Sequence, residues 1–160
     1  TAVVHQSELE KFLKRNTKLI SREETGTLKE SNLSEKVVFT NGCFDVLHQG
    51  HRQLLKQAKS LGDVLVVGLN SDASISRLKG AARPINSVAQ RVEVLSALSE
   101  VDAIIVFEED TPLELLQELK PNVLVKGGDY QPNEVVGKDV VDEVIIIPLV
   151  EGISTSILVN

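Results

Sequence analysis

Short apolar runs alternate with helical patterns from residue 37 onward, and this alternation limits the fold strongly. The apolar runs have the length of buried strands and lie at residues 37–39, 64–69, 103–107, 122–125 and 144–147. Helical patterns with capping signals begin near Gln49, Ser71, Ser87, Thr111 and Ser154. Strands that alternate with helices form parallel sheets with right-handed crossovers. The sequence therefore predicts an α/β fold, a doubly wound, five-stranded parallel sheet of the Rossmann-like kind.

The helical patterns also predict which side chains face the sheet. The expected core-facing residues are Leu54, Ala58, Leu61, Ile75, Leu78, Val88, Val92, Leu95 and Leu98. The apolar side of the helix at residues 88–98 suits either the core or a subunit contact, so a homodimer is one expected arrangement. In parallel sheets of this kind, ligands bind beyond the carboxyl ends of the strands. The polar, glycine-bearing loops after the first, second, fourth and fifth strands are therefore expected to come together around one ligand-binding site.

Residues 1–35 are polar and are predicted to form a helical extension ahead of a domain at residues 36–160. Capping-box patterns begin at Ser7 and at Ser21, although Gly26 weakens the helix behind the second one.

Composition excludes several classes of function. A net charge of −6 disfavours a nucleic-acid or acidic-membrane surface, because such surfaces need a basic field. It leaves a small anionic ligand open, since a local nest of N–H groups is sufficient to bind one. The single cysteine fits a reducing compartment, and neither a long apolar span nor a signal segment is present. A soluble, cytoplasmic protein that binds small molecules is expected.

Residues 37–51 combine a strand, a turn and a helix entrance. The run at 37–39 leads into Thr40-Asn41-Gly42, which has the chemistry of a turn, and a helix follows His48 and His51. Such an arrangement points backbone N–H groups at one spot and so favours phosphate binding. Histidines three residues apart lie on one helix face and can reach the same anion. The interpretation is nucleotidyl transfer to a phosphorylated substrate.

Two other interpretations of the histidine pair remain open. It could ligate zinc, but a zinc site needs further ligands, and the chain offers only His5 and Cys43 besides carboxylates. It could also be a structural pair whose hydrogen bonds are satisfied within the fold.

The pattern Asn41-Gly42-x-Phe44-Asp45-x-x-His48-x-x-His51 resembles the signature of the cytidylyltransferase-like nucleotidyltransferases. Further segments resemble the heptose 1-phosphate adenylyltransferases, and they lie at residues 38–42, 69–74, 77–80, 83–86, 90–91, 107–112, 125–130 and 154–155. This resemblance implies transfer of AMP from ATP to D-glycero-D-manno-heptose 1-phosphate, for lipopolysaccharide core biosynthesis. No kinase-sized segment precedes the domain, so the free-standing form is expected.

The resemblance also implies roles for individual residues. The catalytic residues would be His48, His51 and Lys79. ATP would be bound by Thr40, Asn41, Gly42, Cys43, Phe44, Lys126, Gly127, Asp129, Tyr130, Ser154 and Thr155. The sugar phosphate would be bound by Asp45, Asn70, Asp72, Arg83 and Arg91. ATP is the substrate and Mg²⁺ accompanies it, with no metal held by the protein alone.

Each implied role has a structural alternative. Arg91 could equally form a salt bridge, Arg83 could fix the shape of its loop, and Asn70 and Asp72 could cap a helix. Related cytidylyltransferases place an arginine before the Ser-Thr element, but residues 149–152 hold none. Lys126, Lys79 or Mg²⁺ would then serve the triphosphate. Two other functions remain open, namely a cytidylyltransferase for glycerol phosphate or a similar alcohol phosphate, and a nucleotide-binding module without catalysis.

Overall fold

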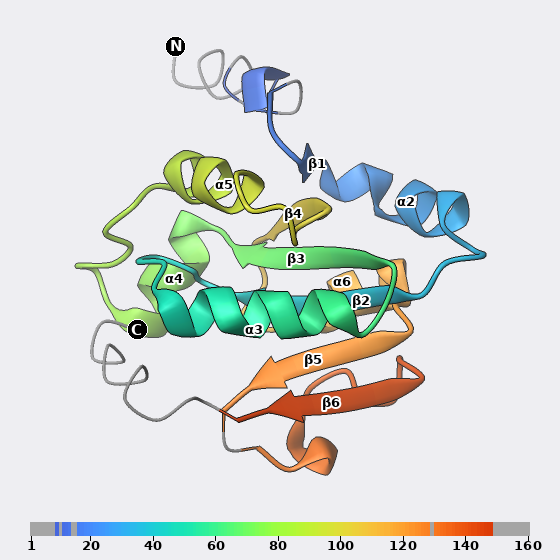
Figure 1. Ribbon diagram of the computed structural model, residues 1–160. Coiled ribbons are helices and arrows are strands. Elements are labelled where there is room, and N and C mark those ends of the chain that lie inside the picture. The colour runs from blue at the N-terminus through green and yellow to red at the C-terminus, as the bar shows by residue number, and fades with distance from the viewer. Residues whose placement is uncertain (1–8, 10, 14–15, 129, 149–160) are drawn as a thin grey trace.

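A six-stranded sheet forms the centre of the protein (Figure 1). The computed structural model describes residues 9, 11–13, 16–128 and 130–148. All strand pairs are parallel, and the strand order is β1-β4-β3-β2-β5-β6. The strands are β1 (Leu19–Ile20), β2 (Val37–Gly42), β3 (Val64–Asn70), β4 (Ala103–Phe107), β5 (Val123–Gly127) and β6 (Glu143–Ile147). The predicted doubly wound α/β fold is confirmed, but the predicted count of five strands is one short.

The missed strand is β1, which comes from the segment predicted as a helical extension. Leu19 pairs with Ile104 and Ile20 pairs with Ile105. Two residues are too few to produce an alternating pattern, so β1 gave no sequence signal. The Ser21 capping box is present at the 3₁₀ helix η1 (Arg22–Glu24), which leads into α2 (Thr25–Ser31). Ser7 lies outside the described residues, and the domain division at residue 35 stays a prediction.

The remaining helices begin close to the predicted positions. They are α3 (Gln49–Ser60), α4 (Asp72–Lys79), α5 (Val88–Ser96), α6 (Leu113–Leu119) and the 3₁₀ helix η2 (Pro132–Glu134). Ser71 and Ser87 cap α4 and α5 as expected, each accepting a backbone N–H. At α6 the N-cap is Pro112, one residue after the predicted Thr111, whose Oγ1 accepts the Leu113 N–H at 3.5 Å.

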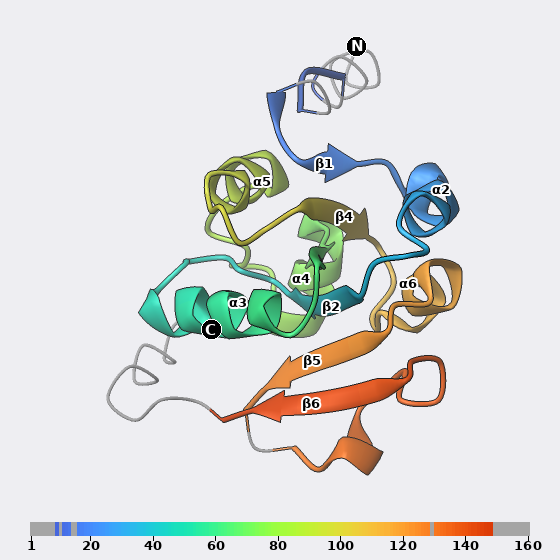
Figure 2. The same cartoon turned by 45° about the vertical axis from the view of Figure 1, so that its right-hand side comes forward.

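Alternate residues of each strand feed two apolar clusters on opposite faces of the sheet. In β2, Val38 joins the cluster under α3 and α5, whereas Phe39 joins the cluster under α6. Figure 2 shows α3 and α5 on one side of the strands, with α2 and α6 on the other. A sheet covered on both faces explains the nearly continuous apolar runs of β3 and β4. One core prediction is wrong, since Leu78 is 50% exposed at the end of α4.

The strand order places the crevice of the sheet beside β2. This strand pairs with β3 on one side and with β5 on the other. The chain leaves β2 toward β3 and β4 and later returns to β5, so the order switches between β2 and β5. Ligands of doubly wound sheets bind at the carboxyl ends of the strands at such a switch. The loops after β2 and β5 flank this position.

Candidate functional site

Residues 43–47, here called the signature loop, connect β2 to α3 without regular secondary structure. The turn predicted at residues 40–42 is wrong, because β2 continues through Gly42 and the turn follows it. Gly42 instead leaves space for the Phe44 ring, because a Cβ at this position would lie 3.0 Å from it. Phe44 itself has a φ of 46°, an unusual value for a residue that is not glycine.

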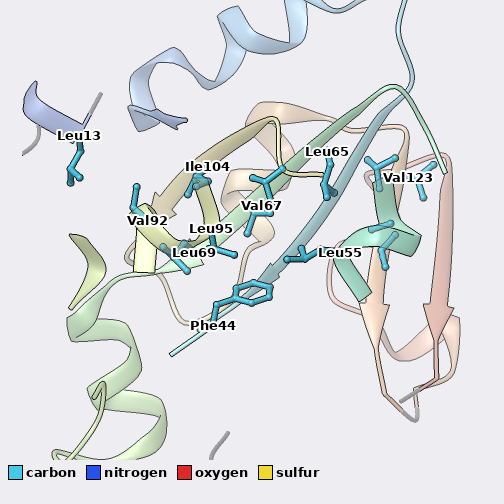
Figure 3. Packing of buried hydrophobic residues seen from close by; sticks show 14 residues of the cluster. Leu13, Phe44, Leu55, Leu65, Val67, Leu69, Val92, Leu95, Ile104 and Val123 are labelled. Atoms are coloured by element: carbon cyan, nitrogen blue, oxygen red, sulfur yellow. The ribbon is translucent and has the colours of Figure 1, made fainter. Parts of the chain in front are cut away.

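The Phe44 ring anchors the signature loop to the core. Its side chain is buried and packs in the cluster that contains Leu55 and Leu69, as Figure 3 shows. The ring also meets the His51 ring edge-on, with centroids 5.2 Å apart. The strained backbone at Phe44 is therefore compensated by apolar burial, and the same ring supports one histidine of the site.

His48 and His51 stack on each other at the N-terminus of α3, with ring centroids 3.8 Å apart and an interplanar angle of 23°. His48 is the N-cap residue, and its Nδ1 accepts the Gly50 N–H at 3.1 Å. Nδ1 of His51 accepts the His48 N–H at 3.3 Å. Because both Nδ1 atoms accept hydrogen bonds, each neutral ring carries its proton on Nε2.

The surroundings keep both rings uncharged near neutral pH. Burial lowers the pKa of His48. Burial, His48 and the Lys79 ammonium together lower the pKa of His51 to about 4, although a hydrogen bond with the Val46 carbonyl acts in the opposite direction. The site therefore offers two uncharged imidazoles as hydrogen-bond donors.

Lys79 and His51 line one pocket. The pocket has a volume of about 170 Å³ and is lined by Asn41, Gly42, Cys43, Phe44, His51, Leu54 and Lys79. Lys79 is the last residue of α4, and Gly80 follows it with a φ of 105°. The structure thus brings together His51 and Lys79 with four of the residues predicted to bind ATP, and His48 stacks on His51 beside them. Burial raises the pKa of the Cys43 thiol, which keeps it protonated.

Asp45 lies inside the protein, where its carboxylate holds the segment at residues 83–86. Its side chain is 0% exposed and accepts Nε of Arg83 at 2.8 Å. It also accepts the N–H groups of Ile85 and Asn86, each at 2.8 Å. Burial alone would raise the pKa of Asp45, but the Asn86 and Ile85 N–H groups and the Arg83 guanidinium together lower it. Nη2 of Arg83 is buried and has no hydrogen-bond partner among the described residues.

Arg91 is the largest fully buried side chain among the described residues. Its guanidinium donates to the carbonyls of Cys43, Asn70 and Asn86 and to the Asp72 carboxylate. Asn70 is also buried, and its amide donates to Ser74 Oγ at 3.0 Å. The Asp72 side chain is 46% exposed. Of these residues predicted to bind substrate, Asp72 is the one whose side chain reaches solvent.

The residues predicted to bind ATP at β5 lie on the other side of β2. Lys126 Nζ lies 4.9 Å from the centre of the Tyr130 ring, over its face. Leu54 of α3 would contact a Cβ at Gly127. Thr40 is buried, and its Oγ1 donates to the Val125 carbonyl at 3.0 Å, which ties β2 to β5.

Some predicted site residues fall outside the described part of the chain, namely Asp129, Ser154 and Thr155. Conversely, Asn86 received no role in the sequence analysis, although it donates to Asp45 and accepts from Arg91. The only available signal was its place directly after Arg83-Pro84-Ile85 in a family-like segment.

Two kinds of feature are missing from the described residues. They contain no group of three or more His, Cys, Asp and Glu side chains that could hold a metal ion. This finding gives no support to the zinc interpretation of the histidine pair. No helix in the described ranges combines the length and apolar character needed to cross a bilayer. The cytoplasmic location and the homodimer stay predictions.

A parallel sheet whose switch point carries a stacked histidine pair and a lysine defines an α/β domain of the nucleotidyltransferase class. The chain belongs to the cytidylyltransferase-like family, whose family model matches residues 39–159. This match begins within β2, at Phe39, and includes every described residue of the candidate site.

Individual relatives support the same assignment. The bifunctional protein HldE of Campylobacter concisus is 58% identical over 139 residues, which are 87% of this chain and 29% of that protein. The chain thus spans less than a third of that relative. A crystal structure of the lipopolysaccharide core biosynthesis protein from Thermoplasma volcanium has a TM-score of 0.60 at 30% identity, covering 72% of this chain and 97% of the other. Pantoate-beta-alanine ligase from Francisella tularensis, complexed with beta-gamma ATP and beta-alanine, shares the fold, with a TM-score of 0.62 at 20% identity over 82% of this chain and 67% of the other.

Proposed function

We propose that this chain transfers AMP from ATP to D-glycero-D-manno-heptose 1-phosphate, which gives ADP-heptose and pyrophosphate. One observation carries the chemistry: His51 and Lys79 line one pocket at the carboxyl end of β2, and His48, also uncharged, stacks on His51. The sugar substrate rests on the resemblance of the sequence to heptose 1-phosphate adenylyltransferases. It is further supported by the 58% identity to HldE and by the similarity to a lipopolysaccharide core biosynthesis protein.

In the proposed reaction, an oxygen of the sugar phosphate attacks the α-phosphorus of ATP. A new P–O bond forms there, and the bond between the α-phosphorus and the bridging oxygen breaks, so that pyrophosphate leaves with its electron pair. No general base is required, because the nucleophile is already an anion. The task of the protein is to hold the two phosphates in line and to stabilise the charge that builds on the oxygens.

His48 and His51 would perform that stabilisation. Their Nδ1 atoms accept backbone N–H groups, and in the proposed reaction their Nε2–H groups would donate to phosphate oxygens. These donors lie on a capped helix end whose own N–H groups favour negative charge. Lys79 would neutralise charge on the same phosphates, because it lines the same pocket as His51.

Arg83 would bind the sugar phosphate. Its Nε is occupied by Asp45, whereas its buried Nη2 has no hydrogen-bond partner among the described residues. A buried donor without an acceptor is costly, and a phosphate oxygen would supply the missing acceptor. The exposed carboxylate of Asp72 would bind a sugar hydroxyl.

The loop after β5 would hold the adenosine part of ATP, with Tyr130 and the backbone at Gly127 beside the base. When ATP binds, Lys126 would leave the face of the Tyr130 ring and contact the triphosphate instead. Mg²⁺ would bind mainly through phosphate oxygens and water, since the described residues hold no cluster of three or more metal ligands. Asp129, Ser154 and Thr155 keep their predicted roles at ATP.

The test is pyrophosphate release with Mg²⁺, with each of ATP, CTP, GTP and UTP paired with heptose 1-phosphate and with glycerol 3-phosphate. Release with ATP and the heptose phosphate alone is expected. Release with CTP and glycerol phosphate would keep the chemistry and overturn the substrates. Binding of ATP without release from any pair would overturn the catalytic proposal in favour of a nucleotide-binding module.

A further inference from the structure

The guanidinium of Arg91 connects four separate parts of the chain. Nη1 donates to the Cys43 carbonyl at 2.9 Å and to the Asn70 carbonyl at 2.7 Å. Nη2 donates to Asp72 Oδ1 at 2.7 Å, and Nε donates to the Asn86 carbonyl at 3.1 Å. These acceptors belong to the signature loop, the end of β3, the start of α4 and the segment before α5.

The signature loop depends on such distant contacts for its position. Residues 43–47 form neither helix nor strand, and Phe44 has a positive φ. Polar contacts from residues 83–91 hold this loop at two points: Arg91 at the Cys43 carbonyl, and residues 83–86 at the Asp45 side chain. His48 follows Asp45 by three residues, so its location depends on where these contacts place the loop.

Arg91 also fixes the element that carries Lys79. Asp72, which accepts from Arg91, is the first residue of α4, and Lys79 is its last. A helix of this length behaves as a rigid rod, so an anchored first turn sets the position of the final one. One guanidinium thereby links the loop leading to His48 and His51 with the helix that presents Lys79.

Direct contact between Arg91 and substrate does not fit this geometry. The Arg91 side chain is 1% exposed. An arginine has five N–H donors, and four hydrogen bonds to protein acceptors already use most of them. A substrate phosphate would have to displace buried carbonyls, which would then lose their partners.

We propose that Arg91 is a positioning residue, which touches no substrate and sets the distance between the histidine pair and Lys79. This inference rests on the proposed function and deepens it, because it assigns to a buried side chain the alignment of groups that act on one phosphate. Lysine cannot replace arginine here, since an ammonium cannot reach four acceptors arranged around a planar fork.

The experiment compares Arg91→Lys with the wild-type chain and with Arg77→Lys as the matched control. Arg77 lies in α4, is 50% exposed and pairs with Asp110 at the surface. For Arg91→Lys we expect kcat to fall by about 100-fold, while the Kd for ATP stays within about twofold. We also expect the pKa of His51, followed by NMR, to rise from about 4 toward its ordinary value, because a loosened loop brings it into water and away from Lys79. Arg77→Lys should change none of these quantities.

Several outcomes would overturn the proposal. A lower melting temperature with unchanged kcat and an unchanged His51 titration would make Arg91 merely structural. A raised Kd or KM with kcat retained would make it a substrate ligand. If Arg91→Lys does not fold, Asp72→Asn removes the one charge among the four acceptors, and an unchanged His51 titration there would equally overturn the proposal. If the wild-type chain transfers no AMP, the proposed function fails, whereas the His51 titration still decides the positioning role.

Discussion

The backbone N–H of His48 donates to Nδ1 of His51 at 3.3 Å, so one histidine of the site fixes the ring of the other. The same bond satisfies an N–H group at the start of α3, where the first turn has no partner within the helix. Each histidine therefore has a structural role through Nδ1 and a proposed chemical role through Nε2. Substitutions that preserve only the first role can separate the two.

His48→Asn is the substitution that isolates the chemistry of the first histidine. Asparagine is a good N-cap residue, so its side-chain oxygen can still accept the Gly50 N–H, but the Nε2 donor is lost. We expect kcat to fall by about 10²–10³-fold with little change in melting temperature or ATP binding. Enzyme assays and calorimetry on the same preparation would measure these quantities. His48→Ala serves as the comparison, because it should additionally cost about 0.5–2 kcal/mol of stability through loss of the cap.

His51 predicts how stability depends on pH. Its pKa in the folded protein is about 4, below the value of about 6.5 in an unfolded chain. The unfolded state therefore binds the extra proton first, and the stability that this residue contributes is lost as pH falls from about 6.5 toward about 4. His51→Gln keeps an acceptor for the His48 N–H but cannot titrate. The difference in melting temperature between about pH 7 and about pH 5 should thus be smaller in the variant. An identical difference in both proteins would show that His51 does not titrate as described.

Asp45→Asn tests the buried ion pair that holds residues 83–86. The Asp45 carboxylate is fully buried, and its substitution leaves Arg83 without a charged partner. We therefore expect a loss of about 3–5 kcal/mol in the free energy of unfolding. Denaturant titration would measure it. Asp110→Asn is the control at an exposed pair with Arg77, and it should change stability by less than about 1 kcal/mol. Equal effects at the two positions would contradict the structural role given to Asp45.

Two glycine substitutions are expected to act in opposite directions. A Cβ at Gly68 in β3 would lie 2.6 Å from Cζ of Phe39, so Gly68→Ala should destabilise the fold by about 1–3 kcal/mol. Gly26 lies in α2 with nothing within 4 Å of its Cβ position. Gly26→Ala should therefore stabilise the protein by up to about 1 kcal/mol. Thermal unfolding of the two variants side by side would check the signs, and a stabilising Gly68→Ala would show that β3 has more room than the structure describes.

Sequence patterns correctly predicted elements that leave a local signal in the sequence, such as a buried apolar strand or a helix cap. The strand β4 was predicted with its observed bounds, because a sheet covered on both faces leaves an unbroken apolar run. Ser71 and Ser87 were predicted as caps because a capping signal is local. Leu78 was predicted wrongly, since spacing in a helix of eight residues cannot tell whether a core lies opposite its last turn.

The polar framework of the site could not be predicted in the same way. Arg91 contacts residues that lie 48 and 21 positions away, and Asp45 contacts residues about 40 positions away. A local sequence pattern carries no information on contacts between residues so far apart in the chain. Family resemblance therefore identified Asp45 and Arg91, but their hydrogen-bond partners could not be predicted. The histidine pair was different, because three-residue spacing at a helix entrance already implies a shared face.

The central place of β2 in the sheet has a consequence for how the chain acquires its site. One neighbour of β2 begins 27 residues later at Val64, whereas the other begins 86 residues later at Val123. The pairing of β2 with β5 forms slowly, because closing so long a stretch of chain costs conformational entropy before the strands gain their hydrogen bonds. During synthesis, β2 must wait with one edge exposed until β5 has emerged. The crevice between these two strands would accordingly be among the last features of the domain to assemble, after the β2-β3-β4 half has formed.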